Sequence, residues 1–367
     1  MNKIYYSLGL MSGTSSDGVD ASIIKSDGEN ELKIIDNLYK KYDQNLKNSL
    51  HQLINEIKNL EDLKKRSEKI KKIEQELTIE HVNLSSLLID KNKNIHIDFV
   101  GFHGHTVIHK PKDGYSIQIG DPKLLSKKIK KIVFFNFRKK DILNGGEGAP
   151  LSPIYHKLIY EKIKLTKPLI FLNIGGIANI TLIDVKNNLI SRDVGPGNCL
   201  IDKWMREMSK KSFDKNGECA NSGKVDQNIL NKILDHETYQ ESNSKSLDIK
   251  DFDIAFAKGL TLEDGSATIS TFTSQLISNA INKYKSKFLK IIVCGGGRKN
   301  NYLINKIANL TKLEIIDIDK LGFDGNFIES QTFAYLAIRS HLKKNISFPL
   351  TTGVKLASTG GEIFKNY

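Results

Sequence analysis

Hydrophobic and polar positions alternate in two similar patterns, one at the start of the chain and one near its middle. Apolar residues lead into the glycine- and hydroxyl-rich stretch Gly9–Ala21, and apolar and polar residues alternate beyond it. Such alternation predicts two antiparallel strands joined by a tight turn. The stretch Pro168–Asp184 repeats this pattern through Gly175 and Gly176. The repetition predicts two halves of similar plan.

The same patterns predict the remaining elements. Alternation predicts strands at Ile4–Met11, Val19–Lys25, Leu32–Tyr39, Ile95–Val100, Ile132–Phe135, Leu189–Arg192 and Lys290–Gly297. Apolar residues spaced three and four apart predict helical regions over residues 46–77, 200–208, 265–284 and 324–342. Residues 210–250 are polar and irregular, which predicts an insertion or a lid.

Length and composition set the frame for these elements. A chain of 367 residues is longer than one hydrophobic core usually grows, so we expect two domains, residues 1–160 and 161–367. Hydrophobic residues make up 39% and charged residues 26%, as in ordinary globular proteins. The net charge of +13 does not favour nucleic-acid binding, because the lysines are spread along helical stretches. It indicates a modest attraction for anionic substrates.

Cysteine usage and the N-terminus bear on where the protein acts. Cys199, Cys219 and Cys294 are too few and too widely spaced for a disulfide framework, which fits a reducing compartment. The N-terminus enters a strand without a basic segment, and no stretch of about 18 apolar residues occurs. We therefore expect a cytoplasmic protein without a membrane partner.

Glycines and hydroxyl side chains gather in the turn after the first strand. Gly13 and Gly18 let the backbone approach a ligand closely, and residues 14–16 supply hydroxyls of the kind that phosphate oxygens bind. A hairpin without a ligand uses the same residue types, so this stretch alone leaves both interpretations open. The second turn, at Gly175 and Gly176, favours phosphate binding.

A third glycine turn follows the strand that begins at residue 290. Gly295, Gly296 and Gly297 lie between this strand and a predicted helix. A strand, a glycine turn and a helix N-terminus together form a suitable site for a nucleotide. The motif alone is weak, since any βα turn can use glycine.

Histidines gather in Gly101–Pro111, which we predict to be a loop after the strand Ile95–Val100. His103, His105 and His109 in such a loop suggest either a zinc site or a polar substrate wall. Neither a cysteine nor a nearby carboxylate accompanies them. A binding loop is therefore the favoured interpretation, and we predict no metal ligand.

Charged residues at two further places are candidates for chemistry. Arg138 and Asp141 lie in a glycine-rich stretch and suit either a grip on a sugar or carboxylate, or a local ion pair. Asp193 lies at a predicted strand end, before the turn at Pro196 and Gly197. It is either a catalytic carboxylate or a helix cap, and the spacing alone leaves these alternatives even.

Motifs in order along nearly the whole chain carry a resemblance to a known family. They are GLMSGTSSDGVDA, HGHTVIHKP, FRKKDILNGGEGAPLSP, LNIGGIANIT, DVGPGN, VCGGGRKN and ESQTFAYLA. Together they resemble the anhydro-N-acetylmuramic acid kinase family. The resemblance implies an α/β fold of the actin, Hsp70 and sugar-kinase superfamily, with two ribonuclease-H-like domains flanking a nucleotide cleft.

The resemblance also implies a reaction. The family uses ATP with Mg²⁺ to open the 1,6-anhydro ring of anhydro-N-acetylmuramic acid with water and to phosphorylate O6. The product, N-acetylmuramic acid 6-phosphate, enters cell-wall recycling. The implied partners are ATP and this sugar, without nucleic acid, and a homodimer is left open.

Individual residues carry over where they match the family's motifs. Asp193 matches the catalytic base, Glu329 matches a carboxylate that faces the sugar, and His103, Arg138 and Asn198 match sugar-binding positions. The implied nucleotide contacts are Gly13, Thr14, Ser15, Ser16, Asp17, Gly18, Val19, Asp20, Gly175, Gly176, Gly295, Gly296 and Gly297.

Some residues depart from the family's usual pattern. His105 and Glu147 stand where Gln is usual, and Asn136 stands where Asp is usual. These departures concern the geometry of the sugar site more than the class of reaction. Two other classes stay open: a plain sugar or acyl kinase of the same fold, and an actin-like or chaperone-like ATPase that hydrolyses ATP without sugar.

Overall fold

Two β-sheets organise the fold of this computed structural model, which describes residues 3–163, 165–166, 168–236, 246–284, 288 and 290–367. Unit 1 comprises Met1–Lys164 and Phe327–Tyr367, and unit 2 comprises Leu165–Asn326. The structure therefore corrects the predicted division into residues 1–160 and 161–367. The last forty or so residues return to unit 1 instead of completing the second half.

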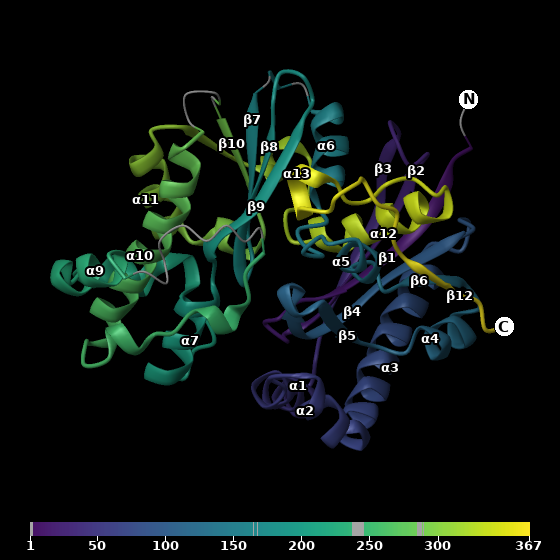
Figure 1. The fold of residues 1–367 in the computed structure, drawn as a ribbon, viewed down its shortest axis with the longest axis horizontal. Coiled ribbons are helices and arrows are strands. Elements are labelled where there is room, and N and C mark those ends of the chain that lie inside the picture. Colours follow the sequence, from purple (N-terminus) through teal and green to yellow (C-terminus); the bar gives the residue numbers. More distant parts are fainter. Residues whose placement is uncertain (1–2, 164, 167, 237–245, 285–287, 289) are drawn as a thin grey trace. The chain divides into compact units, whose positions relative to one another are not determined.

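The sheet of unit 1 starts with the antiparallel meander that the alternation predicts (Figure 1). Its strands are β1 (Tyr5–Ser12), β2 (Gly18–Ser26), β3 (Leu32–Lys41), β4 (Phe99–Lys110), β5 (Tyr115–Ile119), β6 (Ile132–Phe135) and β12 (Glu362–Phe364). They lie in the order β12-β6-β4-β1-β2-β3, with β5 paired to β4. Strands β4 and β6 run parallel to β1.

The sheet of unit 2 has the same plan. Its strands are β7 (Leu169–Ile174), β8 (Ile177–Ile183), β9 (Leu189–Pro196), β10 (Lys290–Cys294) and β11 (Glu314–Asp317), in the order β11-β10-β7-β8-β9. In both units a three-stranded antiparallel meander is followed by two strands added in parallel beside its first strand. This topology confirms the predicted α/β class with two ribonuclease-H-like units.

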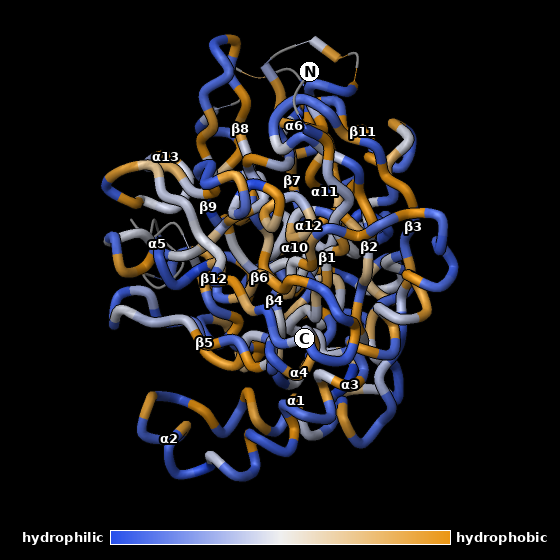
Figure 2. Tube along the Cα trace, turned by 90° about the vertical axis from the view of Figure 1, so that its right-hand side faces the viewer, coloured by the Kyte–Doolittle hydropathy of each residue, from blue (hydrophilic) through white to orange (hydrophobic). Residues whose placement is uncertain are grey.

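Helices cover both faces of the sheet in unit 1. They are α1 (Gln44–Glu56), α2 (Leu60–Lys65), α3 (Ser67–Lys91), α4 (Pro122–Ile129), α5 (Lys139–Leu143), α6 (Pro153–Lys162), α12 (Ile328–His341) and α13 (Pro349–Thr352). Hydrophobic and hydrophilic stretches alternate along α1 and α2, as in amphipathic helices (Figure 2). Leu8 and Leu10 of β1 share one core cluster with Leu50 of α1, Leu77 of α3 and Leu125 of α4.

Two glycines on the opposite face of this sheet let α12 pack directly on the strands. A Cβ on Gly9 would lie 1.9 Å from the carbonyl oxygen of Ser330, and a Cβ on Gly101 would lie 2.0 Å from that of Phe333. Neither distance is possible between real atoms. The close approach of α12 to β1 and β4 explains why the C-terminal segment belongs to unit 1.

Gly101→Ala is therefore expected to lower the free energy of unfolding of unit 1 by about 3 kcal/mol, because the methyl group forces α12 away from β4. Urea unfolding followed by far-UV circular dichroism measures the loss. Gly13→Ala is the matched control, since a Cβ there meets no atom closer than 3.9 Å. Equal stabilities of the two variants would contradict the packing argument.

Unit 2 is covered by α7 (Cys199–Met208), α8 (Glu218–Ser222), α9 (Gln227–Leu234), α10 (Leu262–Asn282) and α11 (Asn301–Thr311). Ile277 and Ile281 of α10 pack with Leu303 of α11 against the sheet. Ile269 and Phe272 of α10 pack in a second cluster with α7 and α9. The predicted amphipathic helix is therefore buried on more than one side, and its serines and threonines replace the expected polar face.

Two predictions about local structure are wrong. Strand β4 starts at Phe99 and continues to Lys110, so the histidines lie in a strand rather than a loop. Strand β9 continues to Pro196, four residues beyond the predicted end. The region 210–250, for which we predicted an insertion or a lid, contains α8 and α9, and its residues 237–245 lie outside the described part.

Candidate active site

The first glycine turn (residues 13–17) joins β1 to β2. The N–H of Ser16 donates to the carbonyl of Gly13 at 3.0 Å, and Ser16 adopts a left-handed φ of 54° although it is not glycine. The carbonyl of Asp17 accepts the N–H of Tyr42 at 3.0 Å. These bonds fix the turn from the side of the protein core.

His105 contacts two serines, Ser12 at the end of β1 and Ser16 within this turn. One ring nitrogen, Nδ1, lies 2.9 Å from Oγ of Ser12, and Nε2 lies 3.3 Å from Oγ of Ser16. The hydroxyl of Tyr42 donates to the same Oγ of Ser12 at 2.9 Å. Burial lowers the pKa of His105 to about 3, so the ring is neutral at neutral pH.

His103 faces a different group of residues, because Gly104 between the two histidines has a φ of 74° and interrupts the alternation of the strand. Its Nδ1 donates to the carbonyl of Gly104 at 2.9 Å, so Nε2 accepts from the guanidinium of Arg138 at 3.0 and 3.3 Å. Burial, followed by the Arg138 charge, holds the pKa of His103 well below its usual value. A neutral His103 therefore orients Arg138.

Asp141 organises the loop that follows Arg138. Its carboxylate accepts the N–H of Gly148 and the hydroxyl of Thr352, both at 2.7 Å. Arg138 donates to the carbonyl of Gly148, also at 2.7 Å. Arg138 and Asp141 therefore both hold this loop in place. The hydrogen bond between Asp141 and Thr352 of α13 was not predicted from the sequence.

Two other sequence candidates in unit 1 have distinct surroundings. Glu329 lies in the first turn of α12 and is exposed. Asn136 adopts a φ of 59°, and its side chain donates to the carboxylate of Glu362 at 2.7 Å. Asn tolerates this left-handed conformation better than most residues, so its presence at this departure from the family pattern is sterically reasonable.

The second glycine turn joins β7 to β8 and lies against the start of α7. The N–H groups of Gly197 and Cys199 donate to the carbonyl of Gly176 at 2.9 and 3.2 Å, and that of Asn198 donates to Gly175 at 2.7 Å. A Cβ on Gly197 would lie 2.2 Å from the carbonyl oxygen of Gly175. Glycine is therefore required at position 197 for this close approach.

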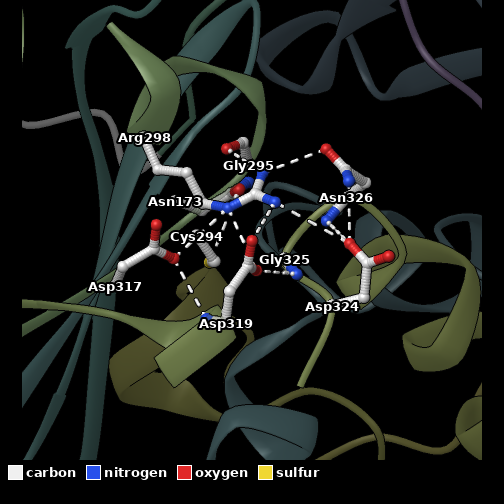
Figure 3. Close-up of polar contacts among 9 residues, drawn as sticks. All are labelled: Asn173, Cys294, Gly295, Arg298, Asp317, Asp319, Asp324, Gly325 and Asn326. Carbon is white, nitrogen blue, oxygen red and sulfur yellow. Dashed lines mark hydrogen bonds and ion pairs between the residues drawn. The ribbon is translucent and has the colours of Figure 1, made fainter. Parts of the chain in front are cut away.

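The third glycine turn (residues 295–297) is anchored by Arg298, whose side chain is 1% exposed (Figure 3). Its guanidinium donates to the carbonyl of Gly295 at 3.0 Å and to the carboxylate of Asp319 at 2.7 and 3.2 Å. Asp319 also accepts the N–H of Gly325 at 2.7 Å, and the Gly325 carbonyl accepts the N–H of Gly295 at 3.1 Å. Sequence reasoning missed Arg298, although it directly follows the three glycines.

Asp193 lies inside β9, paired with Asn179 of β8 at an irregularity in the register. It is 9% exposed, and its Oδ2 accepts the N–H of Leu247 at 2.8 Å. The N-cap position of α7 is occupied by Asn198. The alternative in which Asp193 caps that helix is therefore wrong.

Asn198 connects the second and third turns. A Cβ on Gly297 would lie 3.0 Å from its Oδ1, and a Cβ on Gly296 would lie 3.8 Å from its Nδ2. This residue, predicted to bind sugar, thus lies among the predicted nucleotide contacts. Unit 1 holds the first turn, His103, Arg138 and Glu329, and unit 2 holds the other two turns, Asn198 and Asp193.

The described residues contain neither a metal cluster nor a membrane-spanning helix. No group of three or more His, Cys, Asp or Glu side chains in the described ranges is arranged to hold a metal ion. None of the helices in those ranges has the length and apolar character needed to span a bilayer.

Comparison with known families matches residues 5–366 to the model of anhydro-N-acetylmuramic acid kinase. The chain belongs to this family. An anhydro-N-acetylmuramic acid kinase from Pelagibacter ubique is 51% identical over 378 residues, covering 100% of both chains. The one from Methylorubrum populi is 36% identical over 367 residues, covering 96% of this chain and 97% of the relative. The resemblance and the enzyme class expected from the motifs are thus confirmed.

Solved structures of lower similarity were also found. An activator of 2-hydroxyisocaproyl-CoA dehydratase from Clostridium difficile has a TM-score of 0.45 and 15% identity, covering 91% of this chain and 94% of its own. A gluconate kinase from Lactobacillus acidophilus has a TM-score of 0.42 and 11% identity, covering 99% and 94%. Membership in the anhydro-N-acetylmuramic acid kinase family itself implies ATP as phosphoryl donor and a small-molecule acceptor.

Proposed function

We propose that this chain opens the 1,6-anhydro ring of anhydro-N-acetylmuramic acid with water and transfers the γ-phosphoryl group of ATP to O6. The products are N-acetylmuramic acid 6-phosphate and ADP, in the recycling of cell-wall peptidoglycan. Family membership over residues 5–366 supports the reaction class. The nucleotide cleft, the cytoplasmic location and a homodimer stay predictions.

The observation that carries the proposal is an open position in each glycine turn. Among the described residues, a Cβ on Gly13, Gly175 or Gly296 would meet no atom beyond its chain neighbours closer than 3.9, 3.5 and 3.8 Å, respectively. By contrast, a Cβ on Gly18 or Gly295 would lie within 2.5 Å of other atoms. Packing therefore does not require glycine at the three open positions. The close approach of a phosphate to the backbone gives a reason for glycine at these positions.

Mg²⁺ would accompany the triphosphate. Kinase sites usually hold this ion through one or two carboxylates, several waters and the phosphates themselves. When bound, the ion neutralises charge on the phosphates.

The reaction balances with one carboxylate as base. As the water oxygen bonds to the anomeric carbon, the bond from that carbon to O6 breaks and the water proton passes to Asp193. O6 takes the γ-phosphoryl group, the bond from γ-phosphorus to the bridging oxygen breaks, and ADP leaves. A general base is needed because water is a weak nucleophile at an acetal carbon.

The other candidates bind or orient the sugar. The guanidinium of Arg138 binds the sugar's carboxylate through two N–H groups. His103 acts through Arg138, because both nitrogens of the His103 ring already make hydrogen bonds. Glu329 is exposed at a helix start and is suited to orient the water or a hydroxyl. The N–H of Asn198 donates to the carbonyl of Gly175 in the second turn, which supports a role of Asn198 in binding phosphate as well as sugar.

Product analysis tests the proposal. With ATP, Mg²⁺ and anhydro-N-acetylmuramic acid, the sugar product should gain the mass of one phosphoryl group plus one water, with one ADP formed per sugar. A plain kinase would add the phosphoryl group without water. An actin-like or chaperone-like ATPase would form ADP equally fast without the sugar.

Gly13→Val is expected to abolish binding of Mg-ATP without unfolding the protein. The side chain enters space that the chain leaves open but that a phosphate would need. For the unmodified protein, nucleotide at a hundredfold excess over Kd raises the free energy of unfolding by about 2.7 kcal/mol. Thermal melting with and without Mg-ATP measures this shift.

Gly13→Ala is the graded control for this variant, and should keep part of the shift because a methyl group fills less of the space. The melting temperatures without nucleotide should agree among all three proteins. A full Mg-ATP shift in Gly13→Val would remove the first turn from the nucleotide site.

A further inference from the structure

The first glycine turn holds a conformation that its own sequence does not favour. Ser16 has a φ of 54° and is fully buried. A residue with a side chain stays in this left-handed region when surrounding contacts hold it there. The hydrogen bond from its N–H to Gly13 closes the turn but leaves the side chain to be held by something else.

His105 provides that contact from another strand. Its two nitrogens lie 2.9 Å from Oγ of Ser12, which directly precedes the turn, and 3.3 Å from Oγ of Ser16 within it. A neutral imidazole has one donor and one acceptor, and each hydroxyl can serve as either. The ring therefore satisfies both serines, whichever nitrogen carries the proton.

The contact extends to Tyr42, which follows β3. Its hydroxyl donates to Ser12 at 2.9 Å, and its N–H donates to the carbonyl of Asp17 at 3.0 Å. His105 and Ser16 are fully buried, Ser12 is 1% exposed and Tyr42 is 3% exposed. A buried polar network therefore holds the turn on both sides. The hydrogen bonds of such a network fix the positions of the residues that form it.

We propose that His105 is a positioning residue for ATP, which holds the first glycine turn in the shape that receives the phosphates. This inference rests on the proposed function, because it assumes that the turn binds nucleotide. His105 itself touches neither the nucleotide nor the sugar in this role. Its low pKa, about 3, keeps it neutral and so keeps both hydrogen bonds across the physiological range.

His105→Ala should raise KM for ATP roughly tenfold or more, since two hydrogen bonds to the turn are lost. KM for the anhydro sugar should stay within about twofold, because Arg138 is held by His103 and by the carbonyl of Gly148. His105→Gln should restore most of the ATP affinity, as an amide also offers a donor and an acceptor. Steady-state kinetics with each substrate varied in turn measures this difference.

His81→Leu is the matched control. His81 is also fully buried and neutral, but its Nδ1 bonds the carbonyl of Leu77 within α3, and its ring packs on Phe102. It should leave KM for ATP unchanged. An equal rise in both variants, or an unchanged KM for ATP in His105→Ala, would overturn the proposal.

Tyr42→Phe keeps the inference testable where His105→Ala fails to fold, because it removes one hydroxyl from the same network. It should raise KM for ATP by about threefold. An unchanged value would overturn the proposal. Failure of the unmodified protein to bind Mg-ATP would instead refute the proposed function, so the two failures are distinguishable.

Discussion

Asp193→Asn is expected to lower turnover with anhydro-N-acetylmuramic acid by about two to four orders of magnitude, the usual contribution of a general base. The substitution removes the proton acceptor and keeps the size of the side chain. Asn still offers an oxygen to the N–H of Leu247, which Asp193 accepts at 2.8 Å. Steady-state kinetics measures the loss, and the thermal shift with Mg-ATP should persist.

Asp214→Asn is the matched control for this prediction. Asp214 is 6% exposed, belongs to the same unit and accepts the backbone N–H groups of Cys219 and Ala220 at 2.8 and 3.0 Å. Its variant should lose stability but keep near-normal turnover. A well-folded Asp193→Asn enzyme of near-normal turnover would remove Asp193 from the mechanism and leave Glu329 as the next carboxylate to test.

The strands of both meanders were predictable because alternation is a local pattern. Strand β4 was not, since Gly101, His103 and Gly104 look like loop residues. In the structure, Gly101 is needed where α12 packs, and Gly104 turns the chain so that its two neighbouring histidines face different groups. At these positions contacts with distant segments require glycine, and a local sequence pattern does not reveal such contacts.

The return of α12 to unit 1 was unpredictable for a similar reason. A period of three to four residues predicts a helix, but not the sheet on which the helix packs. The packing of α12 on the sheet of unit 1 depends on the two glycines of β1 and β4, which lie more than 200 residues before α12. Likewise, the tie between Ser12 and His105 joins residues 93 positions apart.

The glycine turns themselves were correctly predicted as turns, but not what anchors them. Arg298 contacts Asp319 because β10 lies beside β11, although the two residues are 21 positions apart in the sequence. The predicted place of Asp193 at a strand end was wrong, because the residue lies inside β9. Its pairing with Asn179 of β8 belongs to the ladder between β8 and β9, and the strand ends three residues further on, at Pro196.

Acid is expected to unfold unit 1 before unit 2, because buried neutral histidines are concentrated there. Burial lowers the pKa of His81 to about 4, that of His105 and His156 to about 3, and that of His103 well below its usual value. In the unfolded chain these groups titrate near about 6.5. The unfolded state therefore binds more protons, and stability falls as the pH drops from 6.5 towards these folded-state values.

Each such histidine adds about 1.4 kcal/mol per pH unit to the slope within this window. Of the nine histidines in the chain, His236 is the one that belongs to unit 2. The single tryptophan, Trp204, is buried in unit 2, so its fluorescence follows that unit while circular dichroism follows both. Between pH 6.5 and 5, urea midpoints by circular dichroism should fall well ahead of those by fluorescence.

Removing one buried histidine should flatten this dependence by a fixed amount. His156→Leu takes away a fully buried group whose pKa is lowered by burial, so the slope of the unfolding free energy of unit 1 should fall by about 1.4 kcal/mol per pH unit. His96→Leu, at an exposed position in the same unit, controls for the loss of a histidine as such. Carboxylates are still mostly ionised above pH 5 and contribute little to this slope. An unchanged slope in His156→Leu would therefore mean that the buried imidazoles are not the source of the acid sensitivity of unit 1.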